Sequence, residues 1–279
     1  MESLQSVMLG ITQGLTEFLP VSSSGHLVLL QNLFGIREPE LLFDISLHIG
    51  TLIAIFIVFY REIRNILQTL LRLPNLIKSS ENLKSLFADN EEIRIAALII
   101  IGSIPTAILG ILFHKIADQI FGSVWIVGLM LLVTGTLLWF TRQMCVEGRP
   151  LIKVSIRDAL MIGLIQGMAI MPGISRSGAT ISMALFLGMN REVAGRYSFL
   201  LSIPAILGAL MLGLDSTIIQ TNIPVKIILL GTVIAAIVGY IALEILLRIV
   251  KQGRLYYFAP YCWLLGAATL IWSFGTWTK

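Results

Sequence analysis

Six long apolar segments constrain the fold of this chain more than any other feature of its sequence. A helix needs about 20 apolar residues to cross the hydrocarbon layer of a membrane. Segments of this kind lie at 41–60, 93–113, 123–141, 192–214, 224–249 and 256–272. Only 13% of the residues are charged, whereas soluble domains carry about 25%. Because the segments do not alternate strictly, they predict an all-α integral membrane protein with six transmembrane helices rather than a β-barrel.

Two further regions are apolar but interrupted. Residues 1–36 are broken at Pro20, and residues 158–189 are broken at Pro172, with polar residues on both sides of each break. Each half is short for a membrane crossing. We therefore expect two re-entrant helical hairpins, whose irregular turns are tolerated at membrane depth only where protein or water surrounds them.

Basic residues predict the orientation of the chain. Most of the 20 Lys and Arg residues fall on one side of the predicted spans, together with the soluble segment 61–92. Because cytoplasmic loops are enriched in basic residues, we expect 61–92 to be a cytoplasmic loop or surface helix and both termini to lie outside. The net charge of +4 comes from these loops, and no basic face alternates with aromatic residues, so no nucleic-acid partner is expected. Cys145 and Cys262 form no disulfide or metal motif.

The two interrupted regions resemble each other. The pattern G-x-x-Q-G begins at residues 10 and 163, and S-x-S-G begins at residues 22 and 175, each pair 153 residues apart. Three spans separate the hairpins, so the second hairpin must enter from the opposite face. This predicts one membrane domain built as an inverted-topology repeat, about 1–141 and 158–279, with its broken helices directed at a polar site. Chance matching of small residues is the alternative.

In the first hairpin, Gln13 and Glu17 are four residues apart and share a helix face. A carboxylate inside a membrane protein costs several kcal/mol unless it is paired or binds a cation. A divalent cation such as Mg²⁺ uses one or two carboxylates together with phosphate and water. Gln13 and Glu17 are therefore candidate metal ligands; a structural hydrogen bond from Glu17 to the neighbouring turn is the alternative.

The turn that follows Pro20 carries hydroxyls and an imidazole. One serine of Ser22, Ser23 and Ser24 is expected to cap the next helix, which leaves hydroxyls for other roles. Ser23 and His26 are three residues apart on one helix face, a spacing that suits a nucleophile and a base, or a phosphate donor and a general acid. A packing role is the alternative for His26. His48, in the middle of a span, and His114 are weaker candidates.

The second turn, P-G-I-S-R-S-G-A-T, has the composition of a phosphate site. Gly173 permits close approach to a ligand, and the N-terminus of the following half-helix favours anions. Arg176 presents a planar fork that matches phosphate oxygens, and further hydroxyls come from Ser175, Ser177 and Thr180. Pairing of Arg176 with Glu17 is an alternative that is compatible with phosphate binding. The two turns together suit hydrolysis of a phosphoanhydride in a lipid-linked substrate.

Q-G-L-T-E-F-L-P-V-S-S-S-G-H and P-G-I-S-R-S-G-A-T closely resemble the two signature regions of the undecaprenyl-diphosphate phosphatase family, also known as bacitracin-resistance proteins. The resemblance covers essentially the whole chain. It implies hydrolysis of undecaprenyl diphosphate to the monophosphate carrier lipid of cell-wall synthesis, with a divalent cation, Mg or Ca, in the bacterial inner membrane and a site open to the outer face. A homodimer is a further expectation.

The resemblance also assigns residues. The acidic motif of the family falls on Gln13 and Glu17, although some members have Glu at the first position. Its serine and histidine positions fall on Ser22, Ser23 and His26, and its second motif carries over Ser175, Arg176, Ser177 and Thr180. Our working mechanism has Ser23 attack the terminal phosphate, with His26 or Glu17 taking the proton; direct attack by water is the rival.

Three other classes of function remain open from the residues alone. Inverted repeats with broken helices are also typical of transporters, so a transporter or flippase of an anionic lipid is the main alternative. An intramembrane serine protease would use the serines near His26 but leaves Arg176 without a role. A structural scaffold leaves both Arg176 and Glu17 without one.

Overall fold

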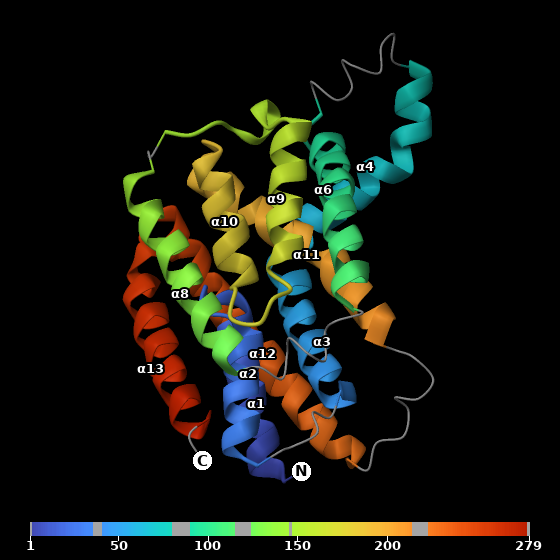
Figure 1. Ribbon diagram of the computed structural model, residues 1–279. Helices are drawn as coiled ribbons and strands as arrows, with labels where there is room; N and C mark the ends of the chain where they lie inside the picture. Colours follow the sequence, from blue (N-terminus) through green and yellow to red (C-terminus); the bar gives the residue numbers. More distant parts are fainter. Residues whose placement is uncertain are drawn as a thin grey trace.

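The computed structural model describes residues 2–35, 41–79, 90–114, 124–144, 147–213 and 223–277, and these are almost entirely helical (Figure 1). An isolated bridge between Arg149 and Met189 is the one β-type pairing within the described ranges. The α-helices are α1 (Ser3–Phe18), α2 (Ser23–Leu33), α3 (Leu41–Val58), α4 (Tyr60–Ser79), α6 (Glu91–His114), α8 (Val124–Phe140), α9 (Ile156–Met168), α10 (Arg176–Phe186), α11 (Arg191–Gly213), α12 (Val225–Lys251) and α13 (Ala259–Trp277).

Within the described ranges, five helical segments are long and apolar enough to span a membrane: Glu91–Phe113, Val124–Gln143, Arg191–Leu212, Val225–Lys251 and Leu255–Ser273. Leu42–Val58 of α3 and Tyr60–Ile77 of α4 pass the same test only together, and they are bent by 78° at the break between them, so they count as a sixth span only if the pair is one broken span. Five of the six predicted segments match the long spans, although the helices extend a few residues beyond several of the predicted ends, and the predicted segment 41–60 matches the first helix of the bent pair. The protein is thus a multi-pass helical membrane protein. The predicted loop 61–92 contains α4, and its residues 80–89 lie outside the described ranges.

Both interrupted regions fold as a pair of short helices joined by a turn. Leu19 leaves the helical region, with ψ 140°, because a residue that precedes proline avoids the α conformation. Ser22 has φ 71° and is the single non-glycine residue with positive φ on the described part of the chain. In the second pair Gly173 supplies the positive φ, 98°. With 11 to 16 residues each, at about 1.5 Å per residue, the four helices are shorter than a bilayer.

Each short helix pair packs against a helix from the other half of the chain. α1 lies along α12, and α9 lies along α6. Figure 1 shows α9 and α10 at one end of the bundle and α1 and α2 towards the other, where the N-terminus lies. Glycines make the approach close: a Cβ on Gly14 would lie 2.8 Å from Val238 Cβ, and one on Gly163 would overlap the carbonyl of Gly102. The glycines of the repeated motif therefore serve packing between the two halves.

Candidate active site

The two turns meet in the interior and are bonded to each other. The backbone N–H of Gly173 donates to Ser22 Oγ at 3.1 Å, and Ser177 Oγ donates to the carbonyl of Phe18 at 2.8 Å. Both serines are buried, at 1% exposure. The contact holds the end of α1 and the start of α2 against the start of α10, and it places the polar residues of both motifs together.

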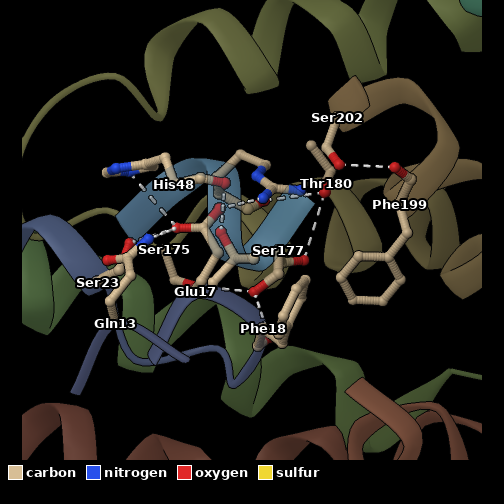
Figure 2. Close-up of polar contacts among 12 residues, drawn as sticks. Gln13, Glu17, Phe18, Ser23, His48, Ser175, Ser177, Thr180, Phe199 and Ser202 are labelled. Atoms are coloured by element: carbon tan, nitrogen blue, oxygen red, sulfur yellow. Dashed lines mark hydrogen bonds and ion pairs between the residues drawn. The ribbon is translucent and has the colours of Figure 1, made fainter. Parts of the chain in front are cut away.

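Glu17, the penultimate residue of α1, is the centre of this cluster (Figure 2). Its Oε2 accepts hydrogen bonds from Ser23 Oγ at 2.9 Å and from Gln13 Nε2 at 3.1 Å. Its Oε1 forms an ion pair with the guanidinium of Arg176. The carboxylate therefore joins groups from α1, α2 and α10, and the pairing with Arg176 that the sequence left open is present.

The Glu17–Arg176 pair is largely shielded from solvent. The side chains are 7% and 15% exposed. A buried carboxylate is tolerated only when it is paired and hydrogen-bonded, and Glu17 meets both conditions. Nη1 of Arg176, in contrast, is buried without a hydrogen-bond partner. Arg176 therefore binds the carboxylate through Nη2 and keeps Nη1 as a hydrogen-bond donor for a further anion.

Backbone amides add to this anion-binding character. Both α2 and α10 start at the contact between the turns, and in each the serine before the helix caps the third amide: Ser22 caps Gly25 and Ser175 caps Gly178. The amides of the two first residues of each helix have no partner among the described residues. Two helix N-termini therefore present free N–H groups, which favour a phosphate.

The other hydroxyls of the second turn are turned towards the backbone. Ser175 Oγ is the cap of α10 and lies 3.2 Å from Ser177 Oγ. Thr180 Oγ1 donates to the carbonyl of Arg176 at 2.9 Å. All three side chains are buried, and the amide of Gly173 is occupied by Ser22. These residues build the turn in the structure, while their role as phosphate ligands stays a prediction.

Thr134 of α8, which the sequence did not single out, braces the same turn. Its Oγ1 accepts from the N–H of Ser175 at 3.1 Å and donates to the carbonyl of Gly173 at 2.9 Å. The side chain is 1% exposed. The span also contains Thr136, whose hydroxyl bonds within its own helix, so the sequence alone does not single out Thr134.

His26 lies at the rim of the cluster and is bonded away from Ser23. Its Nδ1 lies 2.8 Å from the carbonyl of Ser22, and its Nε2 lies 2.7 Å from the hydroxyl of Tyr261 on α13. Since a carbonyl can only accept, Nδ1 carries a proton. Among the described contacts no hydrogen bond joins His26 to Ser23. The structure thus brings Ser23 together with Glu17, while Ser24 lies nearby at 3.3 Å from Ser22 Oγ.

His48 on α3, a weaker candidate from the sequence, reaches the centre. Its Nε2 lies 3.9 Å from Glu17 Oε2, and Figure 2 shows it on the same side of Glu17 as Ser23. Sequence spacing within one helix could not reveal a contact between α1 and α3.

The residues predicted to hold a cation fit that role. Gln13 Oε1 is buried without a hydrogen-bond donor, while the Nε2 of the same amide donates to Glu17 Oε2; an amide oxygen and a carboxylate are ligands that hard divalent cations prefer. Within the described ranges no group of three or more His, Cys, Asp or Glu side chains is arranged as a metal cluster. Any cation here would complete its coordination with water or substrate oxygens.

Comparison with known proteins identifies the family of the chain. The family model described as "Bacitracin resistance protein BacA" matches residues 6–268. The chain is 52% identical to an undecaprenyl-diphosphatase of Desulfatibacillum aliphaticivorans, over 98% of this chain and 100% of the relative. It is 52% identical to one of Desulforapulum autotrophicum, over 98% and 99%, and 42% identical to one of Halothermothrix orenii, over 97% and 98%. The chain belongs to the bacitracin resistance protein BacA family.

Proposed function

We propose that this protein is an undecaprenyl-diphosphatase, a hydrolase that converts the lipid diphosphate to undecaprenyl phosphate and inorganic phosphate. Membership of the family and the names of its relatives support the substrate. One structural observation carries the chemistry: Glu17 is bonded both to the hydroxyl of Ser23 and to Nη2 of Arg176, while Nη1 of Arg176 has no hydrogen-bond partner. The Ser23 hydroxyl, a carboxylate that can act as a base and a guanidinium that can bind an anion thus lie next to one another.

The geometry favours Glu17 over His26 as the base for Ser23. Ser23 Oγ already donates to Glu17 Oε2 at 2.9 Å, within the range required for proton transfer. In the proposed reaction Ser23 Oγ bonds to the terminal phosphorus while its proton passes to Glu17. The bond from that phosphorus to the bridging oxygen breaks, and undecaprenyl phosphate leaves. Water then attacks the phosphoserine, phosphate is released, and Ser23 recovers its proton.

Arg176 and the helix N-termini hold the transferred phosphoryl group in this scheme. Phosphoryl transfer depends mainly on positioning and on neutralising charge at the equatorial oxygens. Nη1 of Arg176 and the free amides at the starts of α2 and α10 are available for those oxygens. The rival is direct attack by water oriented by Glu17, with Ser23 acting only as a donor.

A divalent cation, Mg²⁺ or Ca²⁺, held by Gln13 and Glu17 is part of the proposal. When bound, it would neutralise the negative charge of the diphosphate. The orphaned oxygen of Gln13 supports this placement. Because the second ligand position is an amide, the site would carry one carboxylate charge rather than two.

The membrane arrangement that we propose follows from the same features. α1–α2 and α9–α10 would be re-entrant hairpins of two inverted repeats, with both termini outside, the basic loops in the cytoplasm and the site open to the outer side of the inner membrane. Contact between the two turns supports this, as does the cross-packing of α1 on α12 and α9 on α6. The homodimer stays a prediction.

The test is release of inorganic phosphate from a C55 lipid diphosphate by purified protein in detergent, with and without a chelator. Detergent leaves no compartments, so hydrolysis there separates an enzyme from a transporter or flippase. We expect activity that is lost with the chelator and is strongly reduced in Arg176→Ala. Full activity in both Arg176→Ala and Glu17→Gln would contradict the proposed site.

A further inference from the structure

His48 presents an unpaired ring nitrogen to the carboxylate of Glu17. Its Nδ1 lies 2.8 Å from the carbonyl of Asp44, which is one turn earlier in α3. Because a carbonyl only accepts, Nδ1 is the protonated nitrogen. In the neutral ring, Nε2 therefore carries a lone pair, and it lies 3.9 Å from Glu17 Oε2 without any other partner in the described structure.

Such an arrangement calls for a positive charge between the two atoms. Glu17 Oε2 accepts hydrogen bonds from Ser23 and Gln13, but within the described structure neither donor bonds the His48 nitrogen. A cation or a proton between His48 Nε2 and Glu17 Oε2 would therefore be held by both groups. The histidine side chain is 36% exposed, so it is not enclosed by the protein. Arg176 cannot supply this charge at Oε2, because it is bonded to the other oxygen of the carboxylate.

Gln13 points to a metal ion rather than a proton. Its Nε2 donates to the same Oε2, while its Oε1 is buried with no donor. Rotation of the amide by half a turn would place that oxygen beside Glu17 and satisfy both groups if a cation were bound. An imidazolium would leave the orphaned Gln13 oxygen unexplained.

We propose that His48 is a ligand of the divalent cation, through Nε2, together with Glu17 Oε2 and Gln13 Oε1. The hydrogen bond from Nδ1 to the Asp44 carbonyl fixes the ring orientation, as backbone carbonyls do for metal-binding histidines. The inference rests on the proposed function only in that a cation binds at Glu17. An imidazole ligand raises affinity for Mn²⁺ more than for Mg²⁺ or Ca²⁺, which prefer oxygen.

Binding of Mn²⁺ alone, without substrate, tests this ligand. Pulsed electron paramagnetic resonance of Mn²⁺ bound to the purified protein should show coupling to a histidine nitrogen. The coupling should change in protein grown with isotopically labelled histidine. This measurement uses the wild-type protein, so its result does not depend on whether a substitution disturbs folding.

Two variants sharpen the assignment. His48→Asn keeps a donor near the Asp44 carbonyl but removes Nε2, so we expect the nitrogen coupling to vanish and Mn²⁺ affinity to fall at least about tenfold. His48→Gln can place an amide oxygen near Glu17, so the coupling should vanish while Mg²⁺ binding is largely kept. His26→Phe, which removes an imidazole bonded to Ser22 and Tyr261, should leave the coupling intact.

The experiment distinguishes an incorrect assignment of His48 as a ligand from an incorrect proposed function. If wild-type protein releases phosphate in a cation-dependent manner but shows no histidine coupling, or if the coupling persists in His48→Asn, His48 is not a ligand and the proposed function still stands. An ion pair between a protonated His48 and Glu17 would give this result. Histidine coupling without any phosphate release would support the ligand and contradict the enzyme.

Discussion

Ser23 and Arg176 are the first residues of α2 and α10, lie 153 positions apart, and both bind the carboxylate of Glu17. The sequence repeat places them at equivalent positions, but one is a hydroxyl and the other a fixed cation. The position equivalent to Glu17 in the second repeat is Ile170. The two turns therefore contribute different groups to the single carboxylate of Glu17. Because the second repeat has no carboxylate at the equivalent position, the repeats form one polar cluster around Glu17 and not one cluster each.

Replacement of Glu17 by Gln should remove the proposed base. The amide keeps the shape of the side chain but cannot take the proton of Ser23. Since a positioned general base contributes about 10²–10⁴-fold, phosphate release should fall by at least about 100-fold. Glu192→Gln is the control, because Glu192 forms an exposed pair with Lys251. Near-normal turnover in Glu17→Gln would exclude it as the base.

Ser23→Ala distinguishes the two mechanisms. If Ser23 is the nucleophile, the variant should lose nearly all turnover and the wild type should accumulate a phosphoserine when the reaction is quenched rapidly. If water attacks directly, the loss should be modest and no phosphoserine should form. Mass spectrometry of the quenched protein, with Ser24→Ala as a neighbouring control, measures the difference.

Loss of Arg176 should destabilise the protein because Glu17 is left as a buried, unpaired charge. Removal of one partner of a buried pair costs about 3–5 kcal/mol, so Arg176→Ala should lower the thermal unfolding temperature in detergent. Addition of Glu17→Gln to Arg176→Ala should restore much of that stability without restoring activity. If the double variant unfolds at the same temperature as Arg176→Ala, the pair is not the source of the loss.

Close packing of α9 on α6 should make Gly163 intolerant of a side chain. A Cβ there would overlap the backbone carbonyl of Gly102, and overpacking typically costs about 1–3 kcal/mol. A Cβ added at Gly208 of α11 would meet no atom within 4 Å, so Gly208→Ala should be neutral or stabilising. The two alanine variants, compared by thermal unfolding, should therefore differ, with the unfolding temperature lowered only in Gly163→Ala.

Thr134→Val should loosen the second turn. Valine keeps the volume but leaves the N–H of Ser175 and the carbonyl of Gly173 without their partner, at a cost of about 1–3 kcal/mol for each buried group. We expect a lower unfolding temperature and a raised KM, since the turn positions Arg176. Thr232→Val removes a hydroxyl that bonds only within its own helix and should change neither quantity.

The sequence predicted the parts of this protein that depend on local composition. Apolar length located the five long spans and the first helix of the bent pair, and the two prolines located the breaks between the short helices. The repeat register located Glu17, Ser23 and Arg176 as members of one cluster. Each of these inferences uses residues close together in the chain or one regular spacing.

Contacts between distant helices were beyond the reach of spacing rules. Ser23 and His26 share a helix face, yet Ser23 is bonded to α1 while His26 is bonded to Tyr261 of α13. His48 joins the centre because α3 lies beside α1. The polar residues of the second turn looked like ligands from their composition, but most of their hydroxyls bond the backbone, a preference that composition cannot reveal.

The packing of α1 along α12 has a consequence for how this chain is made. α1 carries Glu17 and is synthesised before its main neighbour, α12, which begins at Val225. During synthesis the first helix must therefore wait beside the translocation machinery or in lipid, with its carboxylate not yet enclosed. A chain made only as far as α11 would carry every motif of the site but lack the helix that packs most extensively on α1.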